Sequence, residues 1–162
     1  MKPFLVVSLT CTLVVSATAA QMPPVTDAQF VIKASAANAL EVEEGKLAVE
    51  RASDPKLKEF ASKMIADHGA AQESLQEAAR IAGVPASLKL DEVRRSMVDN
   101  LSSRSGVDFD RIYQADQVQA HAEAVALLSD YQASGRNSQL KSWAETTLET
   151  VKMHRATINA MP

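Results

Sequence analysis

Cysteine, aromatic residues, glycine and proline are all scarce in this chain of 162 residues. The one cysteine, Cys11, excludes an intramolecular disulfide and a zinc site built from several thiolates. Aromatic residues make up 4% of the chain, and five glycines and six prolines leave long stretches without a helix breaker. Neither a glycine-rich phosphate loop nor a nucleophile elbow occurs. We therefore predict no catalytic residue and no cofactor-binding motif of these kinds.

The chain also lacks an excess of basic residues. Its formal net charge at pH 7 is −3, and the lysines and arginines form no basic stripe. The electrostatic footprint of a nucleic-acid-binding protein is thus missing. After the first 20 residues, no apolar segment is long enough to cross a bilayer. We expect no nucleic-acid partner and no membrane span in the mature chain, whereas a protein partner or a homo-oligomer stays open.

The N-terminal segment has the composition of a secretory signal peptide. Lys2 supplies a positive charge, residues 4–15 form a mainly apolar run, and residues 17–19 (Ala-Thr-Ala) suit a signal peptidase. A run of about 12 residues is shorter than the roughly 20 that span a bilayer. We predict a cleaved signal over residues 1–20, a single mature domain over 21–162 and a periplasmic location. An uncleaved membrane anchor is the alternative.

The remainder of the chain is rich in Ala, Leu, Glu, Lys and Gln, which favour helix. Apolar residues recur in steps of three and four, and this pattern predicts an all-α fold with helices at about 27–51, 55–82, 90–102, 109–134 and 138–160. The expected end signals are Thr26 or Asp27 as the first cap, Gly83 after the second helix, Asp108 before 109–134, and Asn137 or Ser138 before the last helix.

A faint internal repeat indicates how these helices are arranged. Residues 57–61 (LKEFA) and 140–144 (LKSWA) resemble each other, and each opens a long helix. The repeat suggests two related helical hairpins, which the long connection over 84–106 would join. This arrangement is typical of a ferritin-like four-helix bundle, which is the architecture we predict.

Polar residues interrupt the apolar stripe of the first helix. An advance of about 100° per residue from Phe30 places Glu41 and Glu44 on the inward face and Glu43 on the outward face. Two buried carboxylates in a helical core need a partner, because burying a charge is costly.

The three histidines of the chain lie on three other helices. His68 and His154 fall on the apolar stripes of their helices. Measured from Phe109, Asp116 points inward, whereas His121 lies roughly 120° away and just outside the stripe. All three histidines and Glu41 lie near mid-height of their helices, so the four side chains could meet in the core.

Three imidazoles and a carboxylate suit a divalent transition metal such as zinc, copper or iron. The predicted ligands are Glu41, His68, His121 and His154, with Glu44, Asp67 and Asp116 as secondary candidates. The Glu-x-x-His pattern of di-iron bundles is missing, because Ile65 and Val151 stand three residues before His68 and His154.

Three hypotheses about function follow. The first is an exported metal-binding protein. The second is a non-catalytic structural or stress-related bundle, in which the buried Glu and His residues form a hydrogen-bond network. The third, which we favour least, is a catalytic metalloprotein with an open coordination position.

Four short motifs follow one another along the mature chain. They are 38–48 (NALEVEEGKLA), Phe60-Ala61 to Met64 with Asp67-His68, Phe109-Asp110 to Tyr113 with His121, and Leu140-Lys141 with Ala144, Thr147-Leu148 and His154. Their order and spacing resemble an exported bacterial family, domain of unknown function 4142.

The resemblance implies a ferritin-like bundle outside the cytoplasm and no established activity. It marks five signature positions: Glu41, Glu43, His68, His121 and His154. The chain departs from the family pattern at Glu149, where a proline is expected. This departure implies either a straighter last helix or an additional carboxylate near the site.

Overall fold

The computed structural model describes residues 25–86 and 89–161, and all of their regular secondary structure is helical. The helices are α1 (Asp27–Arg51), α2 (Pro55–Ala82), α3 (Glu92–Ser102), α4 (Gly106–Ser134) and α5 (Ser138–Asn159). The all-α prediction is confirmed for this part of the chain. No helix within it combines the length and hydropathy needed to cross a bilayer. The predicted signal over residues 1–20 lies outside the described residues.

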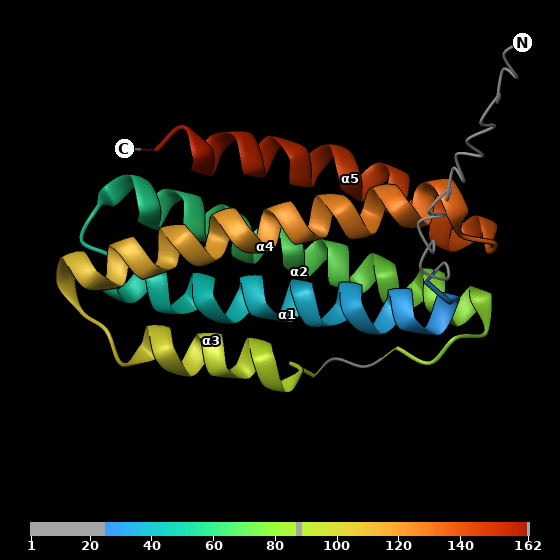
Figure 1. The fold of residues 1–162 in the computed structure, drawn as a ribbon, viewed down its shortest axis with the longest axis horizontal. Coiled ribbons are helices and arrows are strands. Elements are labelled where there is room, and N and C mark those ends of the chain that lie inside the picture. The colour runs from blue at the N-terminus through green and yellow to red at the C-terminus, as the bar shows by residue number, and fades with distance from the viewer. Residues whose placement is uncertain (1–24, 87–88, 162) are drawn as a thin grey trace, which may run out of the picture.

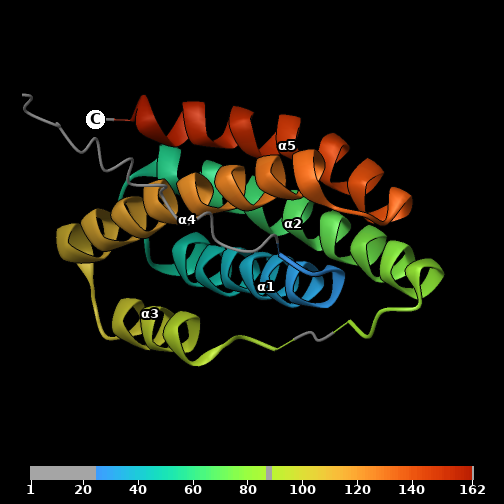
Figure 2. The ribbon, with the colours of Figure 1, turned by 45° about the vertical axis from the view of Figure 1, so that its right-hand side comes forward.

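Four long helices pack side by side, and the short α3 lies against them (Figures 1 and 2). The long helices contact one another in the cyclic order α1, α2, α5, α4, and α3 packs mainly on α1. Within each of the pairs α1–α2 and α4–α5, the two helices run in opposite directions (Figure 1). Helix α2 ends at the opposite end of the molecule from the start of α4, so the connection that contains α3 runs back along its length.

The helix ends follow the capping signals with two corrections. Thr26 forms a capping box with Gln29, and Gly83 ends α2 in a left-handed conformation with φ of 68°. Helix α4 begins at Gly106 after Ser105, so the predicted cap Asp108 is wrong; that residue lies inside the first turn. The helix predicted from residue 90 starts later, because the Asp91 side chain accepts a hydrogen bond from the Arg94 amide at 2.8 Å.

The core consists of two apolar clusters with a polar layer between them. One cluster contains Phe30, Leu75, Tyr131 and Trp143, and the other contains Phe60, Phe109, Tyr113 and Ile158. Along the four long helices, the buried polar residues fall between these clusters; they are Ser35, Asn38, Glu41, Glu44, His68, Gln117, His121 and His154. A polar layer in the middle of a helical core demands hydrogen bonds or bound ligands, since unpaired buried polar groups are costly.

One carboxylate joins the two hairpins at the end of the molecule near the α1–α2 turn. The Asp110 side chain of α4 accepts hydrogen bonds from the Ser53 amide at 2.8 Å and the Asp54 amide at 3.0 Å. We expect Asp110→Ala to lower the free energy of unfolding by about 1 kcal/mol, as the loss of a helix cap does. Glu145→Ala is the control, because it removes an exposed carboxylate from the middle of α5, where surface substitutions change stability little. Equal urea midpoints for the two variants would contradict this role.

Candidate metal centre

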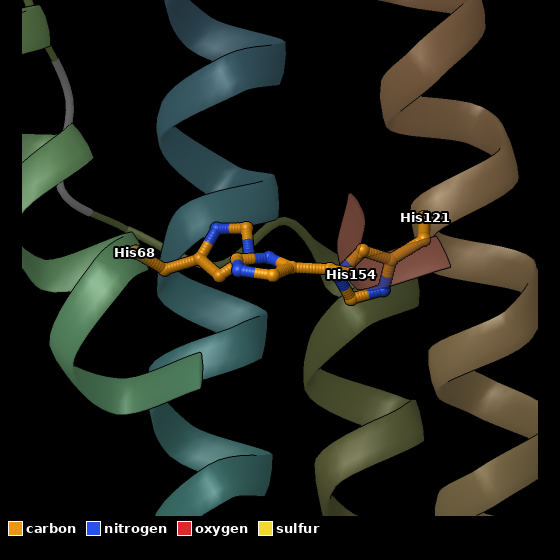
Figure 3. A group of neighbouring side chains, drawn as sticks. All are labelled: His68, His121 and His154. Atoms are coloured by element: carbon orange, nitrogen blue, oxygen red, sulfur yellow. The ribbon is translucent and has the colours of Figure 1, made fainter. Parts of the chain in front are cut away.

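Three buried imidazoles meet in the polar layer. His68 on α2, His121 on α4 and His154 on α5 expose 5%, 0% and 1% of their surface. Their ring centroids lie 5.5 to 5.7 Å apart, and one nitrogen of each ring lies within 4.8 Å of a nitrogen of the other two (Figure 3). The chain thus brings its only histidines together from three helices.

The ring of His68 is held by an amide pair on its outer side. Its Nδ1 lies 3.0 Å from Oδ1 of Asn38, and Nδ2 of Asn38 donates to Oε1 of Gln72 at 3.3 Å. Because the Asn38 oxygen accepts, Nδ1 of His68 carries the proton. Nε2 then bears a lone pair, and it has no hydrogen-bond partner among the described residues.

The other two rings are fixed in the same way. His121 donates from Nδ1 to the backbone oxygen of Gln117 at 2.8 Å, and His154 donates from Nε2 to Oδ2 of Asp67 at 2.7 Å. Lys63 holds the same Asp67 oxygen from the solvent side at 2.7 Å. Nε2 of His121 and Nδ1 of His154 find no hydrogen-bond partner in residues 25–86 and 89–161. Each imidazole therefore has one nitrogen anchored and the other free to bind.

The surroundings favour neutral rings. Burial, together with the neighbouring imidazoles, lowers the pKa of His68 to about 3. Burial lowers the pKa of His121 to about 4, although its bond to the Gln117 backbone opposes the shift. Burial also lowers the pKa of His154, although Asp67 opposes this shift. Neutral imidazole is the form that binds metal ions.

Glu41 lies behind His121. Its Oε1 is 3.6 Å from Nδ1 of His121, the nitrogen already bonded to Gln117, and it is not part of the three-histidine group. Burial raises the pKa of Glu41 to about 8, and Gln117 partly offsets the shift.

The choice between Glu43 and Glu44 is resolved by their burial. Glu44 is 0% exposed, as the helical wheel predicts, and burial raises its pKa to about 9. Glu43 lies on the surface and pairs with Lys46 at 2.8 Å. The signature position that the family resemblance marks at Glu43 therefore faces solvent.

Gln117, like Ser35 and Asn38, is a buried polar residue that the sequence reasoning missed. It is 0% exposed, donates from Nε2 to Glu44 at 3.2 Å, and accepts from His121 through its backbone oxygen. Asp116 beside it is half-buried, and burial raises its pKa. Asp116 and Glu44 thus extend the polar layer away from the histidines, in the direction of Tyr113.

The placement of His121 just outside the stripe of α4 is wrong. The buried residues of α4 cover an arc of about 120°, with Phe109 at one edge and His121 at the other. The prediction took Phe109 as the centre of that arc. Gln117 lies inside the same arc, about 80° from Phe109, so a wheel centred on that arc places it inward as well.

Of the two alternatives for Glu149, the one that adds a carboxylate near the site is wrong. Glu149 is 71% exposed and pairs with Lys152 at 2.9 Å on the surface of α5. Helix α5 continues without a break through this position.

A groove on the surface borders two of the histidines, His68 and His154. It lies between α2 and α5, has a volume of about 580 Å³, and is lined by His68, His154 and Asp67 together with Lys63 and Thr150. A second cavity of about 20 Å³, large enough for one water molecule, borders Glu41 and His68 inside the core.

The donor set fits a transition-metal ion. Three neutral imidazole nitrogens suit zinc, copper or iron, and their hydrogen-bonded outer nitrogens are the usual second contacts of metal-bound histidines. Three nitrogens bound to one zinc ion lie about 3.3–3.6 Å apart, so rings whose nitrogens lie within 4.8 Å of one another would have to move closer by about 1 Å at most to bind it. Fold and site together define an all-helical protein with a buried three-histidine cluster.

The chain belongs to the family named domain of unknown function 4142, whose pattern matches residues 13–161. The family resemblance drawn from the motifs is therefore confirmed. No curated protein matches the sequence.

Two solved structures share the fold. One is assigned as a secreted protein of domain of unknown function 305 from Streptomyces coelicolor, with a TM-score of 0.67 and 12% identity over 80% of this chain and 85% of that one. The other is CopM in its Cu(II)-bound form, with a TM-score of 0.67 and 16% identity over 83% of this chain and 93% of that one. At these identities the likeness establishes the fold alone.

Proposed function

We propose that the mature chain binds one divalent transition-metal ion through His68, His121 and His154. The observation that carries this proposal is the set of three buried ring nitrogens that lack hydrogen-bond partners among the described residues and belong to neighbouring rings. An unpaired buried acceptor costs about 1–3 kcal/mol. Three such nitrogens in one place are best explained by a metal ion that all three coordinate.

We assign Glu41 to charge compensation. The sequence analysis proposes it as a ligand, but its carboxylate lies at Nδ1 of His121, whereas the unpartnered nitrogen of that ring is Nε2. The raised pKa of Glu41 keeps its carboxyl protonated near pH 7 when no metal is bound. A bound cation would favour the ionised form, and the carboxylate would then offset part of the charge of the ion from behind the ring. Asp67 would orient His154 and increase the basicity of its free nitrogen. Glu44 and Asp116 lie further along the polar layer.

Copper is the metal that the comparisons favour. CopM has the same fold and was solved with Cu(II) bound. Imidazole is a suitable ligand for both copper and zinc. Among divalent metals of this row, a given site usually binds copper most tightly. We propose copper first, with zinc and iron as the other candidates.

We propose a ferritin-like four-helix bundle located in the periplasm as the setting of this site. The antiparallel pairs α1–α2 and α4–α5 and the long connection between them support that architecture (Figure 1). The signal-like composition of residues 1–20 supports export of a single domain over 21–162. The missing Glu-x-x-His pattern argues against a di-iron centre of the usual kind.

A structural role for the same residues is the alternative. The bond from His68 to Asn38 links α2 to α1, and the bond from His154 to Asp67 links α5 to α2. The bond from His121 to the Gln117 backbone stays within α4, and the Gln117 side chain links that helix to Glu44 of α1. Such a layer between two apolar clusters could fix helix register without any metal.

Metal titration of the mature protein separates the two functions. Residues 21–162, purified without a histidine tag, are expected to bind one equivalent of Cu(II) in a calorimetric titration. His68→Gln, His121→Gln and His154→Gln should each weaken binding by more than about 100-fold, beyond the loss typical of an outer partner. Glu149→Gln, which changes an exposed carboxylate of α5, is the control. Equal affinities in all five proteins, or no binding to the wild type, would favour the structural role.

Asp67→Asn is expected to weaken metal binding by about 10- to 100-fold without abolishing it. The amide oxygen still accepts from His154 but no longer carries the negative charge that strengthens the ligand. Competition with a chromophoric chelator measures the affinity, and Glu43→Gln serves as the matched surface control. An affinity identical to that of the wild type would show that His154 is not a ligand oriented by Asp67.

A further inference from the structure

We infer that Gln72 is a positioning residue of the metal centre: it orients the amide of Asn38 and thereby sets which nitrogen of His68 carries the proton. The inference rests on the proposed function and adds to it a side chain whose hydrogen bonds go to Asn38 and Ser35 rather than to a histidine. It is carried by the chain of hydrogen bonds that leads outward from the His68 ring.

Two of the three rings have outer partners that can only accept a hydrogen bond. His121 faces the backbone oxygen of Gln117. His154 faces the carboxylate of Asp67, whose pKa is lowered by its hydrogen bonds to Lys63 and His154 against the opposing effect of burial. Neither partner has a proton to offer, so each fixes a proton on the outer nitrogen of its ring without further help.

The outer partner of His68 can act in either way. The amide of Asn38 has an oxygen that accepts and an NH₂ group that donates, so either end could face the ring. Its Nδ2 donates to Oε1 of Gln72 at 3.3 Å, and this leaves its Oδ1 at 3.0 Å from Nδ1 of His68. The amide of Gln72 donates in turn to Oγ of Ser35 through a long bond of 3.5 Å. The oxygen of Gln72 thus holds Asn38 in the orientation that leaves a lone pair on Nε2 of His68.

This chain of bonds alternates between α1 and α2. Ser35 and Asn38 are three residues apart on α1, and His68 and Gln72 are four residues apart on α2, so each pair lies on one face of its helix. Asn38 is 4% exposed and therefore depends on a protein partner for its NH₂ group, whereas Gln72 is only partly buried. Gln72 can thus be replaced without opening the core.

The opposite tautomer would block the metal centre. With the NH₂ group of Asn38 facing the ring, Nδ1 of His68 would accept and Nε2 would carry the proton. One nitrogen of each ring lies within 4.8 Å of those of the other two, so an N–H at Nε2 would have the lone pairs of His121 and His154 close by. This tautomer would satisfy a buried nitrogen in the metal-free protein, and the bond from Asn38 to Gln72 opposes it.

Gln72→Leu is expected to shift His68 of the metal-free mature protein from the Nδ1-protonated to the Nε2-protonated tautomer. Two-bond ¹H–¹⁵N correlation spectra of protein with ¹⁵N-labelled histidine distinguish the two forms and need no metal. The same variant should weaken Cu(II) binding about 10-fold, because only molecules with a lone pair on Nε2 bind the ion. Gln76→Leu, the same change one turn further along α2, is the control and should alter neither result.

Two further variants separate the orientation of Asn38 from a general loss of structure. Gln72→Glu keeps an acceptor for the NH₂ group of Asn38 and should retain the wild-type tautomer. Asn38→Asp, added to Gln72→Leu, supplies a carboxylate that can only accept, so it should restore the proton on Nδ1 of His68. A merely structural role for Gln72 would produce neither result.

The wild-type spectrum tests the inference independently of any metal. A proton on Nε2 of His68 in the wild type, or an unchanged tautomer in folded Gln72→Leu, would overturn it and leave the proposed function to the metal titration. If Gln72→Leu fails to fold, Gln72→Ala tests the same loss with a residue that favours helix. The expected spectra in a protein that takes up neither copper, zinc nor iron would overturn the proposed function, and with it the role of Gln72 in metal binding.

Discussion

Addition of copper or zinc is expected to raise the midpoint of thermal unfolding of the mature protein by roughly 8–15 °C. An ion that binds only the folded chain adds about 3–4 kcal/mol of stability at 100- to 1,000-fold excess over its dissociation constant. For a domain of this size, each kcal/mol shifts the midpoint by about 3–4 °C. The unfolded chain has no preformed cluster, because His68, His121 and His154 are brought together by three separate helices.

The variant with His68, His121 and His154 all replaced by Gln is the comparison for this prediction. It should unfold at the same temperature with and without metal, whatever its own stability, when followed by circular dichroism. Magnesium, which prefers oxygen ligands, should leave both proteins unchanged. A metal-induced shift of the same size in the triple variant would place the binding site elsewhere.

Glu44→Gln is expected to stabilise the protein by roughly 2–4 kcal/mol at pH 8 and to have little effect near pH 5. Glu44 is 0% exposed, and burial raises its pKa to about 9, with Asp116 and Glu41 adding to the shift. A carboxyl whose pKa is raised in the folded state contributes its full stability below its unfolded pKa near 4.5 and loses it as the pH rises toward 9. Glutamine has no proton to lose, and its side-chain oxygen can still accept from Gln117.

Glu43→Gln is the matched control for this pH dependence. Glu43 is one residue away but lies on the surface in a pair with Lys46, so its replacement should change stability by less than about 0.5 kcal/mol at either pH. Urea unfolding at pH 5 and pH 8 measures the free energy of unfolding of the wild type and both variants. Equal pH slopes for the wild type and Glu44→Gln would mean that Glu44 is ionised or solvated in the folded protein.

Local chemistry made most helix ends predictable. Thr26 with Gln29, Pro55 after Asp54, and Gly83 each leave the chain few alternatives, and α1 and α2 have the bounds that these residues predict. The start of α4 could not be predicted in the same way. Asp108 looks like a cap but occupies the first turn, where an acidic residue is equally favourable.

The candidate site was predictable where a polar residue interrupts a regular apolar stripe. Glu44, His68 and His154 satisfy that condition, and all three are buried. The prediction for His121 was wrong because a helical wheel must be measured from the centre of the buried arc. A single sequence does not define that centre.

The contacts that hold the three histidine rings could not be predicted from the sequence. Asn38 holds His68 from another helix, 30 residues away, and a sequence defines no such pairing. The bond from His121 to the Gln117 backbone spans one helical turn, but it depends on the side-chain conformation of His121, which the sequence does not give. The direction in which each free nitrogen points depends on these contacts. The groove between α2 and α5 depends equally on how two distant helices pack.

Elemental analysis of the mature protein is the most direct test of the central claim. The protein should be isolated without a histidine tag and compared with His121→Gln, which removes the ring that is fully enclosed in the core. The account predicts close to one equivalent of a transition metal, with copper first among the candidates, in the wild type and almost none in the variant. A wild-type protein that contains no metal, and that takes up neither copper, zinc nor iron when these are added, would contradict it.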